Sequence, residues 1–248
     1  QLTGVWPDFS YLKSLQNLDL SYNTFSPAMR LPEGLLGVNC TELRYFKCIS
    51  CNLHGSIPDR SPSFGAAADA GSFGDMNSLR SFQLQDNFLN GTIPGSMHRI
   101  YNLYEISLQS NDLTGTLPSQ LFAYPSDLRY VRLDDNSLSG TIPVSNSQTR
   151  GCTGGDDCKL HVLTAKNNIL TGSIPNQFFD FNLNLVTVEL KNNALTGKIP
   201  NGIGRSYDVS GLTTVDFSQN QLTGSIPASI GSIWGRNHAL VTFDVNHN

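Results

Sequence analysis

Histidines and paired carboxylates are the residues of this chain that could support catalysis or hold a metal ion. Two pairs of adjacent aspartates occur, but the carboxylates of a glycosidase face each other across a cleft rather than adjoin in sequence. The five histidines show no metal-ligand spacing such as HExxH, and there is no GxSxG, P-loop or dinucleotide-binding glycine motif. We therefore predict that the chain is not an enzyme and uses no metal or other cofactor. These residues are Asp134-Asp135, Asp156-Asp157, His54, His98, His161, His238 and His247.

Two of the cysteines bracket a short loop rich in glycine and aspartate. Cys152 and Cys158 would constrain this loop if they formed a disulfide, and disulfides persist mainly outside the cytosol. Two free thiols are the alternative. A zinc site fits less well, because the pair has neither CxxC spacing nor a second pair beside it. We predict a Cys152–Cys158 disulfide and an oxidising compartment.

The remaining cysteines, Cys40, Cys48 and Cys51, are three in number, so at least one stays unpaired unless it bonds elsewhere. Cys48 falls on an apolar position and reads most simply as a small buried residue. A bond from Cys40 to Cys48 and a bond from Cys40 to Cys51 both remain open at this stage.

Two N-glycosylation sequons support the same compartment. They are Asn39-Cys40-Thr41 and Asn90-Gly91-Thr92. Asn90 is the stronger candidate, because it lies at an exposed position between Leu89 and Gly91, whereas Asn39 belongs to the poorer cysteine-containing form. We predict glycosylation at both and a secretory route for the chain.

A repeated segment must position all of these residues. Residues 103–118, LYEISLQSNDLTGTLP, alternate apolar and polar side chains as a strand with one buried face does, and then reach an asparagine, a glycine and a Leu-Pro pair. A single strand of this kind cannot bury its apolar face alone, so the repeats must stack on one another. The same order returns at 79–94, 128–143, 160–175, 185–200 and 212–227.

This pattern resembles the plant-type extracellular leucine-rich repeat, LxxLxLxxNxLxGxIP, over nearly the whole chain. The resemblance implies an α/β repeat solenoid, a right-handed leucine-rich-repeat superhelix with a concave parallel β-sheet. Its convex side is expected to consist mostly of loop and 3-10 turns.

The repeat indicates one elongated domain over residues 1–248 with about nine strand segments. Insertions near 59–76, 144–159 and 205–211 lengthen individual coils and are expected to lie in loops. Both ends fall inside a repeat, so we expect the chain to be part of a longer protein.

The residues between the leucines should project from the concave sheet. Arginine and tyrosine are enriched at binding hot spots, and they gather here on four adjacent strand segments. An ordinary solvated sheet face is the alternative. We expect charge reversal at Arg80, Arg129 and Arg132 to abolish partner binding without lowering the melting temperature. The predicted contact residues, which we call the concave patch, are Arg44, Tyr45, Lys47, Arg80, Gln83, Tyr104, Glu105, Arg129, Tyr130, Arg132 and Asp134.

Composition excludes two classes of partner. The net charge is −4 and charged residues make up 15% of the chain, so no strongly basic surface is available for nucleic acid. No apolar run approaches the roughly 18 residues of a membrane span.

These observations predict an extracellular or cell-surface leucine-rich-repeat module. The resemblance implies that it binds a protein, peptide or polysaccharide partner on its concave and lateral surface, as part of a receptor ectodomain or as a secreted binder. The alternative is a structural or adhesive extracellular glycoprotein that self-associates and uses the repeats as a rigid spacer.

Overall fold

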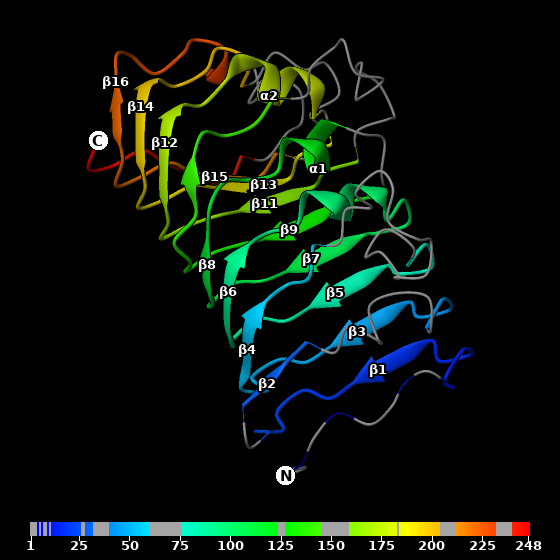
Figure 1. The fold of residues 1–248 in the computed structure, drawn as a ribbon. Coiled ribbons are helices and arrows are strands. Elements are labelled where there is room, and N and C mark those ends of the chain that lie inside the picture. Colours follow the sequence, from blue (N-terminus) through cyan, green and yellow to red (C-terminus); the bar gives the residue numbers. More distant parts are fainter. Residues whose placement is uncertain are drawn as a thin grey trace, which may run out of the picture.

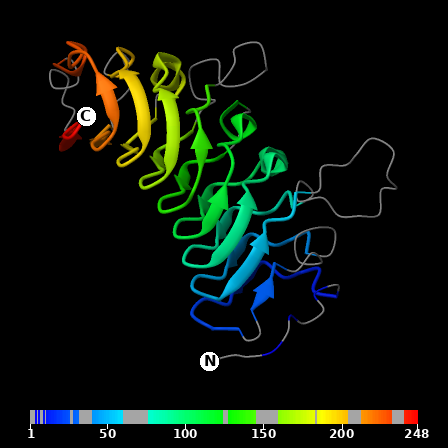
Figure 2. The same ribbon diagram turned by 60° about the vertical axis from the view of Figure 1, so that its left-hand side comes forward.

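A computed structural model describes residues 4, 6, 9, 11–25, 28–31, 40–59, 76–123, 127–144, 159–182, 184–203, 212–231 and 240–248. Within them, nine short strands form one parallel sheet in which each strand pairs with the next one along the stack (Figure 1). The stack follows a curved axis, with this sheet on its concave face (Figure 2). The strands are β1 (Asn17–Asp19), β3 (Tyr45–Lys47), β5 (Ser81–Gln83), β7 (Glu105–Ser107), β9 (Tyr130–Arg132), β11 (Val162–Thr164), β13 (Thr187–Glu189), β15 (Thr214–Asp216) and β17 (Thr242–Asp244).

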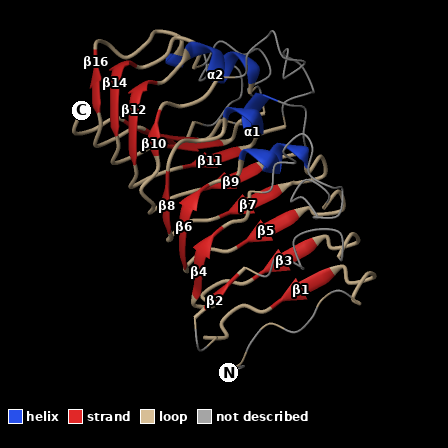
Figure 3. Cartoon of the chain, viewed as in Figure 1, coloured by secondary structure: helices blue, strands red, loops and turns tan. Residues whose placement is uncertain are grey.

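Two further four-stranded parallel sheets, which the repeat pattern did not lead us to predict, run along a lateral face of the stack (Figure 3). They form because each LxGx segment after the asparagine lies beside its equivalent in the next coil. The first contains β2 (Met29–Arg30), β4 (Leu53–Ser56), β6 (Phe88–Thr92) and β8 (Asp112–Thr114); the second contains β10 (Ser139–Gly140), β12 (Ile169–Ser173), β14 (Ala194–Lys198) and β16 (Gln221–Thr223).

Short helices follow some of the lateral strands. They are the 3-10 helix η2 (Gly95–Arg99), α1 (Ser119–Ala123) and α2 (Asn176–Phe181). Pro94 and Pro175 occupy the N-cap positions of η2 and α2, where a residue without an N–H is tolerated. None of the helices in the described part of the chain has the length and apolarity required to cross a bilayer.

The leucines of the repeat form one continuous core. Leu108, Leu133 and Leu190, from three different coils, are each at most 1% exposed. Each apolar strand face is buried against the next coil, so the stability of the stack is a sum over neighbours. The predicted leucine-rich-repeat solenoid is therefore confirmed.

An asparagine ends each concave strand from β5 onward and joins its coil to the preceding one. The Nδ2 of Asn111 donates to the carbonyl oxygen of Leu108 in its own coil (3.1 Å) and to that of Leu84 in the preceding coil (3.0 Å). Its Oδ1 accepts from the backbone N–H of Leu89, again in the preceding coil, at 2.9 Å. The same three bonds recur at Asn87, Asn136, Asn168, Asn193, Asn220 and Asn248.

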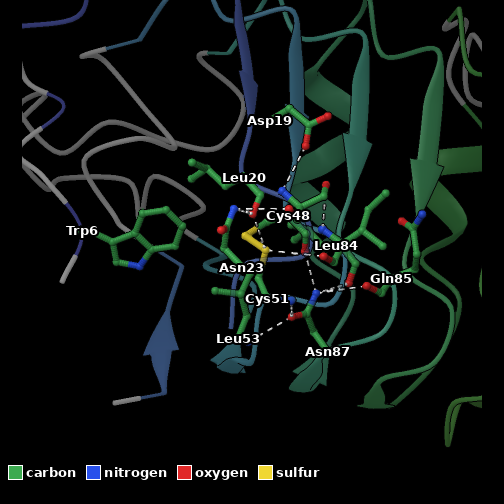
Figure 4. Close-up of a disulfide and its surroundings, with 12 residues drawn as sticks. Trp6, Asp19, Leu20, Asn23, Cys48, Cys51, Leu53, Leu84, Gln85 and Asn87 are labelled. Carbon is green, nitrogen blue, oxygen red and sulfur yellow. Dashed lines mark hydrogen bonds between the residues drawn. A yellow bond between two sulfur atoms is a disulfide. The ribbon is translucent and has the colours of Figure 1, made fainter. Parts of the chain in front are cut away.

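A disulfide takes the place of one of these asparagines (Figure 4). Cys51 stands at the asparagine position of the second coil and bonds to Cys48, with their Cα atoms 5.5 Å apart. Cys40 is a free buried thiol, and burial raises its pKa. Both pairings through Cys40 that the sequence left open are therefore wrong.

The physical reason lies in the turn, which points the residue at position 51 back toward the end of its own strand, three residues earlier. A disulfide sulfur has no proton, so it cannot replace the donor of the asparagine amide. The N–H of Phe25, whose equivalent in the other coils donates to an asparagine Oδ1, donates here to the backbone carbonyl of Cys51 at 3.3 Å.

Candidate functional site

The register of the concave sheet brings the predicted patch together. Tyr45 pairs with Ser81, Ser81 with Glu105, and Glu105 with Tyr130, so these four residues form one row across β3, β5, β7 and β9. A second row contains Lys47, Gln83, Ser107 and Arg132. Neighbouring strands lie about 4.8 Å apart, so side chains in one row touch across the strands.

Glu105 is the centre of the polar contacts in this patch. Its Oε2 accepts from the Oγ of Ser81 (3.0 Å) and from the Nε2 of Gln83 (2.7 Å). Its Oε1 accepts from the Nη1 of Arg132 at 2.7 Å, in an ion pair whose side chains are 34% (Arg132) and 20% (Glu105) exposed. The carboxylate is therefore neutralised and fixed in orientation by residues from β5 and β9.

The aromatic residues of the patch form a second group beside Glu105. The Tyr104 and Tyr130 rings are 5.1 Å apart, and the guanidinium groups of Arg129 and Arg132 lie over them at 5.4 and 5.2 Å respectively. Such cation–π contacts hold long side chains in place. A hydrogen bond to Tyr130 is the main cause that raises the pKa of the Tyr104 phenol, with burial adding to it.

A hollow of about 300 Å³ opens on the concave face next to this aromatic group. Its carboxylates are in use, since Glu105 is paired with Arg132 and Asp127 with Lys159 at 2.6 Å. Lys47 and Arg80 form no ion pair with any other described residue, although Asp19, opposite Lys47 on β1, is close enough for the charge of Lys47 to help lower the pKa of the Asp19 carboxyl. The hollow therefore offers two cations that are not bound by a carboxylate of its own lining. Its lining consists of Tyr45, Lys47, Arg80, Ser81, Gln83, Asn102, Tyr104, Glu105 and Asp127.

Six of the predicted patch residues therefore line the hollow, and three more, Arg129, Tyr130 and Arg132, support its wall. Arg44 is exposed but is not part of the lining. Ser81, Asn102 and Asp127 were missed. Asn102 and Asp127 each directly precede the first leucine of their repeat, and this shared position is the signal that would have identified them as the rim of the sheet.

Asp134 lies apart from the hollow, in a cluster at the end of β9 and β11. Its oxygens accept from the Oγ1 of Thr164 (2.8 Å) and from the backbone N–H of Lys166 (2.7 Å), and the Nζ of Lys166 pairs with Glu189 at 2.7 Å. Burial raises the pKa of the Asp134 carboxyl, although the bonds from Thr164 and Lys166 act in the opposite direction.

The remaining predicted sites have mixed outcomes. Cys152, Cys158 and Asn39 lie outside the described residues, as does most of each predicted insertion. Asn90 is exposed on β6. No group of three or more His, Cys, Asp or Glu residues with the geometry of a metal site occurs in the described ranges.

Comparison with known proteins gives one family model and several solved structures. Residues 184–206 and 211–233 match the model described as Leucine Rich Repeat, which describes a structural repeat rather than a catalytic domain. No curated protein matches the chain significantly.

Among solved structures, the chain is similar to PEPR1 in complex with AtPEP1, with 32% identity, a TM-score of 0.74, and coverage of 94% of this chain and 29% of that one. It is also similar to the Arabidopsis receptor kinase HAESA, solved with the peptide hormone IDA and the co-receptor SERK1. The identity is 32%, the TM-score 0.74, and the coverage 98% of this chain and 40% of the other.

A third similar structure is the ectodomain of the membrane receptor kinase GASSHO1/SCHENGEN3 from Arabidopsis thaliana, in complex with CASPARIAN STRIP INTEGRITY FACTOR 2. The identity is 26%, the TM-score 0.68, and the coverage 99% of this chain and 28% of the other. The chain thus spans less than half the length of each of these three structures.

Proposed function

Because the chain belongs to the leucine-rich-repeat proteins of the plant-type extracellular class, we propose that it is an extracellular binding module for an acidic peptide. The peptide would lie on the concave face with an anionic group in the hollow between Lys47 and Arg80. The observation that carries this proposal is the pair of cations that form no ion pair with another described residue, in a hollow whose own carboxylates are both paired with cations.

The shape and chemistry of the hollow favour an extended peptide over a sugar. Tyr45, which is 41% exposed, provides an apolar wall on one side. The ring of Tyr104 on the other side is already contacted by Arg129 and Tyr130, so it is poorly placed to stack on a pyranose. An arginine and a lysine suit a carboxylate or sulfate, because guanidinium binds such groups through paired hydrogen bonds.

Two observations support an extracellular location. The Cys48–Cys51 disulfide belongs to a class of bond that persists mainly in oxidising compartments. Similar solved structures include the ectodomain of a membrane receptor kinase and a receptor kinase bound to a peptide hormone.

Selection from a library of random peptides tests this function. We expect the protein to enrich peptides that contain acidic residues, with an affinity that falls as the salt concentration rises. Arg80→Glu should remove or reverse the preference for acidic residues. Lys13→Glu makes the same change in charge at an exposed lysine outside the hollow, and it should leave the preference for acidic peptides unchanged.

Two results would contradict the proposal. One is an equal enrichment of acidic peptides by the Arg80→Glu and wild-type proteins. The other is selective binding of an acidic polysaccharide in a parallel glycan screen with no enrichment of any peptide, which would indicate a polysaccharide partner instead.

A further inference from the structure

We propose that Asn90 carries an N-linked glycan whose first sugar packs on the ring of Phe88, both residues lying on the exposed face of β6. The inference rests on the secretory location proposed above. It concerns the lateral face, not the concave patch.

The strand geometry places the necessary residues on one surface. Side chains two residues apart point to the same side of a strand, so Phe88, Asn90 and Thr92 of β6 share a face, while Leu89 between them is fully buried. All three are exposed, and together they form the sequon and the residue two positions before it.

The Asn90 amide is free for modification. In two later coils, the hydroxyl groups of Thr114 and Thr171 stand at the equivalent position, and they donate to a glycine carbonyl of the preceding coil at 3.2 and 3.4 Å respectively. The side chain of Asn90 makes no hydrogen bond to any described residue, so attachment of a sugar would break no existing contact.

Phe88 is an unusual residue for its position. Among the equivalent positions in later coils, Asp112, Ser137, Ala194 and Gln221 are small or polar and Ile169 is an exposed aliphatic residue, whereas Phe88 leaves an aromatic ring 51% exposed. His54 of β4 stacks on this ring, with centroids 4.9 Å apart and planes inclined by 20°. A single exposed aromatic residue is common on protein surfaces, but one held by a neighbour beside a sequon provides an apolar platform for the C–H face of a sugar.

The chemistry requires a lipid-pyrophosphate-linked oligosaccharide and the transferase of the secretory pathway. The amide nitrogen of Asn90 forms a bond to the anomeric carbon of the first sugar and loses one proton to solvent. The bond between that carbon and the pyrophosphate oxygen breaks, and the lipid pyrophosphate leaves with the bonding electron pair.

Site occupancy is the first test. The protein is directed into a eukaryotic secretory host behind a signal sequence, and glycans are mapped by mass spectrometry after enzymatic release in heavy-oxygen water. Wild-type protein should be glycosylated at Asn90 in most molecules, and Phe88→Ser should lower the occupancy several-fold. A matched control is Thr114→Asn, which places the same Asn-Gly-Thr sequence on β8 with Asp112 in the position of Phe88; its occupancy should also be low.

Thermal stability is the second test. Loss of the glycan through Asn90→Gln should lower the melting temperature by about 2–4 °C when Phe88 is present, and by much less in a Phe88→Ser background. Circular dichroism confirms that each variant is folded. An unmodified Asn90 in secreted, folded protein would overturn the inference, as would an equal loss of melting temperature in both backgrounds.

This test separates the inference from the proposed function. The host supplies the secretory route, so glycosylation at Asn90 there is independent of where the protein resides naturally. An intracellular natural location would contradict the proposed function alone.

Discussion

Arg132 donates a hydrogen bond from Nη1 to Oε1 of Glu105 at 2.7 Å and joins β9 to β7 in the middle of the concave patch. Arg80, one strand further along from Glu105, has no such partner among the described residues. The two arginines were grouped in the sequence, where we expected charge reversal at Arg80, Arg129 and Arg132 to abolish partner binding without lowering the melting temperature. The structure assigns them different roles, since Arg132 stabilises the patch and Arg80 faces the hollow.

Charge reversal should therefore separate stability from binding. Arg132→Glu places a second carboxylate against Glu105, which is only 20% exposed, and we expect a loss of about 1–2 kcal/mol in the free energy of unfolding. Arg80→Glu should change it by less than about 0.5 kcal/mol. Urea denaturation of both variants measures this difference, and an equal loss would contradict the assigned roles.

The disulfide should be replaceable by the amide that the other coils use. Reduction of the wild-type protein should cost about 2 kcal/mol, as expected for a short closed loop. In the double variant Cys48→Val with Cys51→Asn, the new amide can donate to the carbonyl of Leu20. Its oxygen can replace the backbone carbonyl of residue 51 as the acceptor of the Phe25 N–H.

We expect reductant to lower the urea midpoint of this variant by less than that of the wild-type protein, because only the predicted Cys152–Cys158 disulfide is left to reduce. The control is Cys48→Val with Cys51→Val, which has neither the disulfide nor the amide and should be less stable. Equal stability of the two double variants would show that an asparagine at position 51 does not serve the preceding coil.

Asp134 gives a prediction on pH dependence. Burial raises its pKa in the folded protein, so the folded state favours the protonated form and the charged form lowers stability. Asp134→Asn retains a bond to Lys166 and removes the buried charge. It should raise the free energy of unfolding at pH 7 by about 1 kcal/mol or less.

This advantage should disappear as the pH falls through the folded pKa toward the ordinary value of about 3.9, where the wild-type carboxyl is also neutral. Urea titrations at pH 7 and pH 3 measure the change. A difference between the two proteins that grows at low pH would contradict the raised pKa.

The glycine that follows β8 of the lateral sheet should tolerate no side chain. Gly115 has a φ of +78°, and a Cβ there would lie 2.7 Å from the Cγ2 of Thr92 in the preceding coil. Gly115→Ala should therefore cost about 1–3 kcal/mol. Gly231→Ala is the control, because a Cβ at that position meets nothing within 4 Å. Thermal denaturation compares the two variants, and similar melting temperatures would show that the lateral packing is looser than the structure indicates.

Much of the fold was predictable because a short apolar period recurs throughout the chain. Leu108, Leu133 and Leu190 had to face one core if the coils stacked. The lateral sheets were not predicted, because segments such as Leu113–Thr114 read locally as a turn before glycine. Their backbone pairing exists only once two coils lie side by side.

The candidate site was predictable in its rows but not in its contacts. Adjacent strands pair without stagger, so the alternation alone placed Tyr45, Lys47 and Gln83 on one surface. Which carboxylate meets which arginine depends on the direction of long side chains, and this is why Asp134 was grouped with Glu105. Cys51 stands where the other coils have an asparagine, but its partner follows from the inward turn that only the folded backbone shows.

The asparagine bonds also give the stack a polarity. Each side chain from Asn87 to Asn248 serves the backbone of the coil before it, so every coil depends on its C-terminal neighbour to satisfy its turn. Removing a coil from the C-terminal end takes away the acceptor of a backbone N–H in the coil before it, whereas removing one from the N-terminal end takes away partners of an asparagine side chain. Fraying should therefore propagate more readily from the C-terminal end of the stack than from the N-terminal end.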